Sequence, residues 1–219
     1  MNYSDFGRFV HRSTFSSNAN ALDFFAEKEG LTRFLLYPSK KHPPLIPLAC
    51  YEIEYTSNSR VNTIQRLTLK NPLIPWFNDP KRLTIAFFFC NVIRQTSIAQ
   101  NTEANSYQVI TEIEGRLMTD ESIFLLPLVC LIRWMEVLGF LPEPVENANY
   151  FDISEGIFLR NHPIPSRGAE AWNILLLNRE VSDNKALREA FYLMINYMEM
   201  HIPNFSITAT LEIIQQILH

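Results

Sequence analysis

The sequence predicts an α+β fold, in which a small β-barrel formed by residues 1–78 precedes an α-helical bundle formed by residues 79–219. Two observations lead to this prediction. The first part of the chain consists of short apolar runs, rich in β-branched and aromatic residues and separated by turn residues, which favours strands. After Pro72, Pro75 and Pro80 the segments become longer and repeat apolar residues at i, i+3, i+4 and i+7, the period of amphipathic helices.

Five strands are expected in the first part, and a small closed barrel of the OB-fold type accommodates five such short strands. In the fourth strand, Ile53 and Tyr55 alternate with Glu52 and Glu54, so one face of the sheet is expected to meet solvent. The five strands are expected at residues 8–12, 21–26, 32–37, 49–55 and 63–69.

A basic loop is predicted between the third and fourth strands, at residues 38–44. Its three prolines prevent regular strand pairing, and Lys40, Lys41 and His42 keep it in solvent.

Six helices are expected in the second part, with a short β-hairpin near residues 148–160 as an insert. Pro80 suits the start of a helix and Gly139 suits the C-terminal cap of the third helix. Pro127 would remove a hydrogen bond inside that helix, which is therefore expected either to kink or to begin later. The hairpin is expected to turn at residues 155–156. The helices are expected at residues 81–96, 106–118, 121–138, 168–177, 183–201 and 208–218.

No pattern in the chain indicates catalysis. Its five histidines lack metal-ligand spacing, and no phosphate-binding glycine loop, nucleophile elbow or zinc-protease motif occurs. The carboxylates Glu112, Glu114 and Glu136 fit a solvated helix face. The three cysteines lie far apart and are expected to be small buried apolar residues. We therefore expect a protein that is not an enzyme and that holds no metal or cofactor.

A cytoplasmic protein with no membrane association is expected. No apolar run reaches the roughly 18 to 20 residues of a membrane-spanning helix. The first nine residues lack the apolar segment and cleavage site of a secretory signal.

Charge is distributed unevenly along the chain. Residues 1–82 carry 11 lysines and arginines against 7 acids, whereas residues 83–219 carry 8 against 16. A basic barrel surface could neutralise backbone phosphates, although from the residues alone the same charges could serve only solubility. Strand alternation places Arg8 and Arg12 on one face of the first strand, together with Val10. The candidate DNA-binding residues are Arg8, Arg12, Arg33, Lys40, Lys41, Arg66 and Lys70.

Aromatic residues accompany these charges. OB-type barrels bind single strands by combining a basic groove with aromatic side chains on which bases stack. Most of the barrel's rings are expected in the core, leaving at most one or two to stack. The six candidates are Phe9, Phe15, Phe24, Phe25, Phe34 and Tyr37.

Seven short motifs follow one another along nearly the entire chain, each mostly encoding packing and turns. They lie at residues 7–11, 24–32, 47–54, 64–67, 137–142, 150–158 and 201–205. The first (GRFVH) resembles the opening G-x-V-L-H strand of the RecO family, and the fifth (VLGFLP) resembles its L-G-F-x-P. In this order and spacing, the seven resemble that family in its Bacteroidetes-type form without zinc.

The resemblance implies a recombination mediator acting at the nucleoid. It would bind single- and double-stranded DNA, anneal strands and, with RecR, help to load RecA onto DNA covered by single-stranded DNA-binding protein (SSB). It also implies that the helical domain receives the C-terminal tail of SSB, in an apolar pocket beside a basic side chain. Arg94 and Arg133 are the candidates for that side chain.

Two departures from the family are visible. The basic loop keeps only Lys40, Lys41 and His42, which predicts weaker phosphate contact and a shallower salt dependence. Residues 140–167 contain no cysteine, so the zinc site of many relatives is not expected.

Two other functions stay open. The chain could be a protein-interaction adaptor that acts through its acidic helices after its barrel has lost DNA binding. It could also be a small-molecule enzyme built in the bundle, but that would need a metal or cofactor that the sequence does not indicate.

Overall fold

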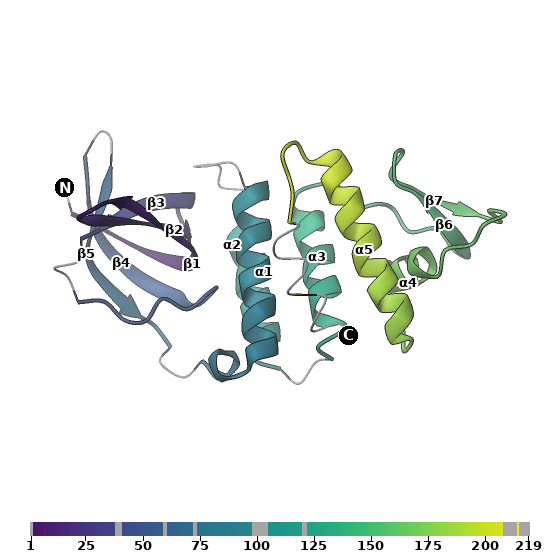
Figure 1. The fold of residues 1–219 in the computed structure, drawn as a ribbon, viewed down its shortest axis with the longest axis horizontal. Coiled ribbons are helices and arrows are strands. Elements are labelled where there is room, and N and C mark those ends of the chain that lie inside the picture. Colours follow the sequence, from purple (N-terminus) through teal and green to yellow (C-terminus); the bar gives the residue numbers. More distant parts are fainter. Residues whose placement is uncertain are drawn as a thin grey trace. The chain divides into compact units, whose positions relative to one another are not determined.

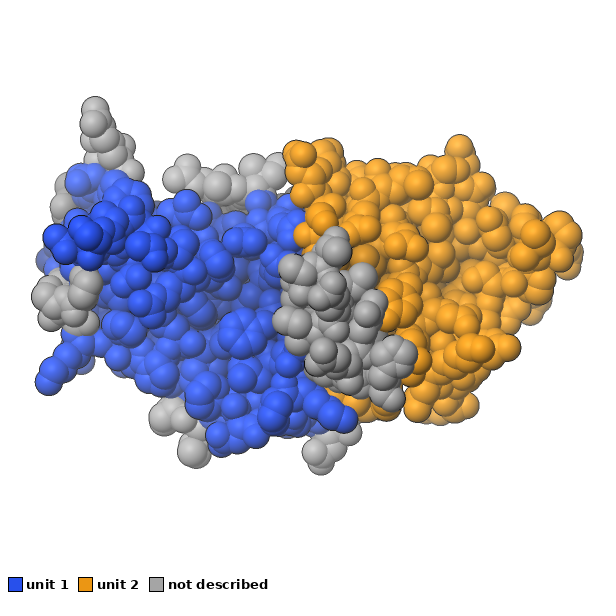
Figure 2. Space-filling model, in the orientation of Figure 1, with its two compact units in different colours: residues 1–119, 209–214 blue, residues 120–208, 215–219 orange. Residues whose placement is uncertain are grey.

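The computed structural model of this chain describes residues 2–37, 41–58, 61–71, 74–97, 105–119, 122–207 and 214. The chain divides into two compact units, coloured separately in Figure 2. Unit 1 comprises Met1–Thr119 and Ala209–Ile214, and unit 2 comprises Asp120–Thr208 and Gln215–His219. The division falls later than the predicted domain boundary after residue 78, because two helices group with the barrel.

Five strands at the start of unit 1 close into a barrel (Figure 1). Their order around the barrel is β1-β2-β3-β5-β4, with β4 pairing back onto β1. β3 and β5 run parallel, whereas the other neighbours are antiparallel. The predicted OB-type barrel is therefore confirmed. The strands are β1 (Asn2–Ser16), β2 (Ala19–Ala26), β3 (Gly30–Leu36), β4 (Cys50–Ser57) and β5 (Asn62–Leu69).

The inside of the barrel is filled by large apolar side chains. Phe24, Phe34 and Tyr51 are fully buried. The ring of Phe24 meets the other two edge to face, with its centroid 5.9 Å from that of Phe34 and 5.6 Å from that of Tyr51. Gly7 allows close packing beside them, since a Cβ there would lie 2.9 Å from the end of the Ile53 side chain and 3.1 Å from the Cβ of Phe24. Of the six aromatic candidates, four are buried and two are exposed. The buried ones are Phe9, Phe24, Phe25 and Phe34, and the exposed ones are Phe15 and Tyr37.

β1 contains an irregularity at Val10, where the pairing with β2 shifts by one residue. Before the shift Arg8 lies opposite Phe25, and after it Arg12 lies opposite Leu22. Because Leu22 and Phe25 are three residues apart on a regular strand, they point to opposite faces. The prediction that Arg8 and Arg12 share a face is therefore wrong, and the inserted residue is the reason.

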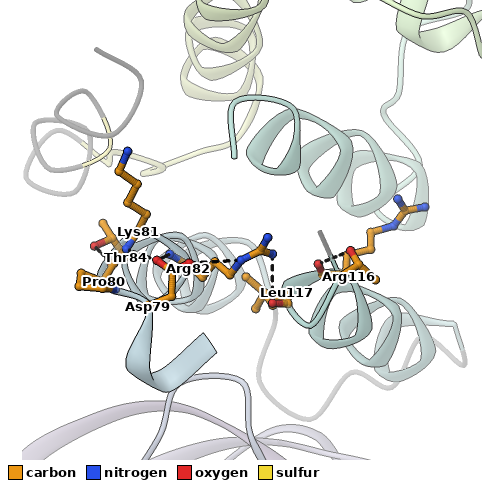
Figure 3. A network of polar contacts seen from close by, with 8 residues as sticks. Asp79, Pro80, Lys81, Arg82, Thr84, Arg116 and Leu117 are labelled. Carbon is orange, nitrogen blue, oxygen red and sulfur yellow. Dashed lines mark hydrogen bonds and ion pairs between the residues drawn. The ribbon is translucent and has the colours of Figure 1, made fainter. Parts of the chain in front are cut away.

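Two helices complete the described part of unit 1, preceded by the short turn η1 (Pro75–Asn78). α1 (Pro80–Thr96) begins at Pro80 as predicted, and the side chain of Asp79 accepts hydrogen bonds from two backbone N–H groups of its first turn. Arg82 donates a hydrogen bond of 3.2 Å to the carbonyl of Leu117, which joins α1 to the end of α2 (Ser106–Leu117), as Figure 3 shows.

Unit 2 contains α3 (Leu126–Val137), the strands β6 (Ala148–Asp152) and β7 (Ile157–Arg160), α4 (Arg167–Leu176) and α5 (Asn184–His201). α3 starts with Pro127 in its first turn, so the later of the two predicted starts is correct. Gly139 follows α3 with a φ of 75°, as expected of a C-terminal cap. The hairpin is also confirmed, with Gly156 at a φ of 69° in its turn. The helix expected at 208–218 falls, apart from Ile214, outside the described residues.

The hairpin packs on α4 and α5 through an aromatic cluster. Trp172 is fully buried, and its ring centroid lies 4.6 Å from that of Phe151, 5.4 Å from that of Phe158 and 5.8 Å from that of Tyr197. The cluster forms a core for unit 2. Within the described ranges, no helix combines the length and apolar character needed to cross a membrane.

Gly168 lies where α4 closely approaches the backbone of α5. A Cβ at this position would lie 2.7 Å from the backbone carbon of Glu189 and 2.9 Å from the nitrogen of Ala190. We expect Gly168→Ala to force the two helices apart and to lower the free energy of unfolding by about 1–3 kcal/mol, the usual cost of overpacking. Urea denaturation followed by circular dichroism measures this loss. Gly115→Ala is the matched control, since nothing lies within 4 Å of a Cβ at that helical glycine.

Candidate functional site

A groove of about 720 Å³ lies on unit 1 between β1, the loop that precedes β4, and α1. The β1 wall contains the residues around the Val10 shift, including Phe9 and Arg12. The loop contributes His42, Pro44 and Leu45.

Hydrogen bonds hold the loop wall in place. The N–H of Leu48 donates to the carbonyl of Phe9 at 2.9 Å, so the loop runs along β1 beyond the end of its pairing with β4. The hydroxyl of Tyr51 donates to the carbonyl of Pro44 at 2.6 Å and accepts from the N–H of Ile46 at 2.8 Å. Burial raises the pKa of Tyr51 to about 12, so this hydroxyl keeps its proton at neutral pH. The loop wall is thereby attached to the barrel core.

The α1 wall is one stripe of the helix. Thr84, Phe87, Asn91 and Arg94 are spaced by three or four residues and all line the groove. Phe87 is 54% exposed, although the next residue, Phe88, is fully buried.

The groove is basic. Arg12 and Arg94 line it from β1 and α1. The guanidinium of Arg12 bonds Asn20 at 3.2 and 3.3 Å, and that of Arg94 bonds Asn91 at 3.2 Å. Both partners are neutral amides, and none of the described residues that line the groove is an acid. The two positive charges are therefore not compensated within its lining.

His11 also lines the groove but contributes no charge at neutral pH. Burial lowers the pKa of its imidazole and Arg94 acts in the same direction, while Asp23 opposes them. Asp23 lies between His11 and Arg33 across the sheet. Asp23 accepts hydrogen bonds of 2.7 and 2.9 Å from Arg33. The DNA-binding candidate Arg33 is therefore already paired with an acid, although the Arg33 side chain is 63% exposed.

Arg8 lies away from the groove, in a buried contact with α2. Its side chain, 7% exposed, forms an ion pair with Glu114 and donates a hydrogen bond of 3.2 Å to Thr111. Its guanidinium also lies 5.6 Å from the ring centroid of Tyr107. This geometry favours a structural role for Arg8.

The remaining predicted cations differ in their surroundings. Arg66 pairs with Glu54 at 3.7 Å, and Lys70 pairs with Glu52 at 3.4 Å, so their face of β4 and β5 is balanced in charge. Lys41 is exposed beside His42, whereas Lys40 lies outside the described residues. Arg133, on α3 in unit 2, pairs with Glu136 of its own helix.

The described residues contain no group of three or more histidines, cysteines or acids that could hold a metal ion. Cys90 and Cys130 are buried and Cys50 is half-buried, and all three are free thiols.

Sequence reasoning missed Phe87. The signal was available, because three consecutive phenylalanines at 87–89 cannot all face the same side of a helix. The helical period places Phe87 with Thr84, Asn91 and Arg94, on the polar stripe of α1.

The chain is thus an α+β protein with an OB-type barrel in its N-terminal part. No family model matches the chain. It is similar to a protein named DNA repair protein RecO from Phocaeicola vulgatus, with 22% identity over 236 residues that cover 96% of this chain and 97% of that protein. This similarity supports the resemblance to the RecO family that the seven motifs indicate.

Proposed function

We propose that this chain is a DNA-binding protein of repair and recombination, and that its groove on unit 1 contacts the phosphates of the bound strand. The observation that carries the proposal is the pair Arg12 and Arg94, which line one groove and whose hydrogen-bond partners among the described residues are neutral amides. Cations in such a position gain free energy by releasing the counterions condensed on DNA. Lys41, exposed beside His42 in the loop wall, adds a further charge to this side.

Binding of this kind needs no covalent step. We propose that the protein acts on single- and double-stranded DNA by binding and annealing, without catalytic turnover and without a cofactor. Neutralised phosphates reduce the repulsion between two strands, which favours their pairing. The site of action would be the cytoplasm, at the nucleoid.

The resemblance to RecO supports three protein partners for this activity. RecR would act with the chain to load RecA, and the C-terminal tail of SSB would bring it to covered single strands. Of the two candidates for receiving that tail, Arg94 lines the groove on unit 1 together with apolar side chains, whereas Arg133 pairs with Glu136. We therefore favour Arg94 for the tail carboxylate, which would then compete with DNA.

Fluorescence anisotropy of a labelled single strand, titrated at several salt concentrations, tests DNA binding at the groove. We expect the double variant Arg12→Gln/Arg94→Gln to bind more weakly, with a plot of log affinity against log salt that is shallower by about 1.4, or about 0.7 for each lost phosphate contact. Arg66→Gln is the control, since Arg66 is equally a surface cation but pairs with Glu54. An unchanged slope in the double variant would place the binding site elsewhere.

The adaptor function remains the second candidate, carried by the excess of acids after residue 82. A folded wild-type protein that binds no DNA at low salt would favour it. The next experiment would then be a pull-down with RecR and with the SSB tail.

A further inference from the structure

The groove on unit 1 contains an exposed aromatic ring that packing of unit 1 does not explain. Phe87 is 54% exposed, while Ile85, Phe88 and Phe89 of the same helix are fully buried. Leaving a phenylalanine in water forgoes the stabilisation that its burial would contribute. Such a ring on the wall of a basic groove has the composition of a stacking platform.

The rest of the groove suits a flat, uncharged group next to charged side chains. Phe9 and Val10 on β1 and Leu45 in the loop are apolar, and they line the groove together with Arg12 and Arg94. A nucleotide has the matching division, since its base is flat and uncharged whereas its phosphate is an anion. Arg12 and Arg94 are thus available to contact the phosphates next to a base in the groove.

The volume of the groove limits what can enter it. About 720 Å³ is within the range of sites that enclose one small molecule, roughly 300–1,000 Å³. One or two nucleotides fit such a space, but a base pair within a duplex presents only its edge and keeps its faces covered by its neighbours. Phe87 can therefore stack only on a base that is unpaired.

We propose that the groove is a subsite for an unpaired base, which stacks on Phe87 while Arg12 and Arg94 contact the adjoining phosphates. This inference rests on the proposed function and deepens it: the groove distinguishes single strands from duplexes. Phe87 is then a specificity-determining residue, and the cations supply the binding that both forms of DNA share.

The test compares Phe87→Ala with Phe77→Ala by anisotropy, on a labelled single strand, on a blunt duplex and on a single strand of abasic sites. Phe77 is the matched control, because it is 45% exposed and does not line the groove. Both changes remove an exposed ring, so circular dichroism should show both variants folded. We expect Phe87→Ala to weaken binding of the single strand by about 5- to 100-fold, the range for loss of one stacked base. Duplex affinity should not change, and the wild type should bind the abasic strand as weakly as Phe87→Ala binds the normal strand.

The outcomes separate this inference from the proposed function. A wild type that binds neither strand nor duplex would overturn both. Binding of DNA with equal affinity by wild type, Phe87→Ala and Phe77→Ala would overturn the base subsite alone, as would an equal loss for strand and duplex. If an acidic peptide with a terminal phenylalanine binds in a Phe87-dependent manner while the single strand does not, the groove is a peptide site and the base subsite is wrong.

Discussion

Glu114→Leu should lower the free energy of unfolding by about 3–5 kcal/mol, because it leaves the guanidinium of Arg8 buried without a counter-charge. Both side chains are at most 10% exposed, and they join β1 to α2 from positions 106 residues apart in the sequence. Among the described residues, Thr111 would remain as a hydrogen-bond partner of Arg8, and its hydroxyl is neutral. Urea denaturation at neutral pH measures the loss.

The double variant Arg8→Met/Glu114→Leu should recover most of that loss. Burial raises the pKa of Glu114 even though Arg8 acts in the opposite direction, so removing the carboxylate from water outweighs its attraction to the guanidinium. Apolar side chains of similar size avoid this cost, and such replacements are often neutral or stabilising by about 1–4 kcal/mol. If Glu114→Leu costs less than about 1 kcal/mol, or if the double variant is the least stable protein, the pair contributes to stability in another way.

Trp172→Ala should cost about 3–5 kcal/mol, the usual loss for removing a buried tryptophan. Its ring contacts those of Phe151, Phe158 and Tyr197, so one substitution removes the common neighbour of the hairpin and α5. Chemical denaturation, with near-ultraviolet circular dichroism to report aromatic packing, checks this result.

Trp172→Phe is the informative control for that substitution. The ring nitrogen of Trp172 makes no hydrogen bond within the described part of the chain. The conservative change should therefore lose buried area but no polar contact, and cost much less than Trp172→Ala. Equal losses for the two variants would mean that the indole N–H has a partner, such as a buried water, that stabilises it.

Local patterns were sufficient for most of the fold. Short apolar runs separated by turn residues predicted β2 to β5, and the prolines and glycines predicted the start of α1 and the end of α3. β1 extends beyond its predicted range at both ends, to Asn2 and Ser16, because its polar ends are held by pairing with β4 and β2. Such pairing depends on strands that are distant in sequence, so no local pattern reports it.

The candidate site was predicted less well, for reasons that differ between residues. Arg12 and Arg94 were singled out from the sequence, but for two separate sites, and the structure brings them to one groove. Arg8 carries the same charge as Arg12, but its partner Glu114 lies on a helix far along the chain. The sequence therefore could not distinguish a cation bound to its own protein from one facing solvent.

The irregularity at Val10 gives β1 two independent halves. In a regular strand, any change that turns one side chain to the other face turns all that follow it. Here the additional residue takes up that change, so the first half contacts α2 through Arg8 while the second presents Arg12 to the groove. Deleting Val10 would restore regular pairing and leave Arg8 and Arg12 on the faces that they occupy now. A strand that kept this residue but paired regularly would instead turn every side chain after it to the opposite face. Whether the pairing at this one point is bulged or regular thus decides on which side of the barrel the charge of Arg12 lies.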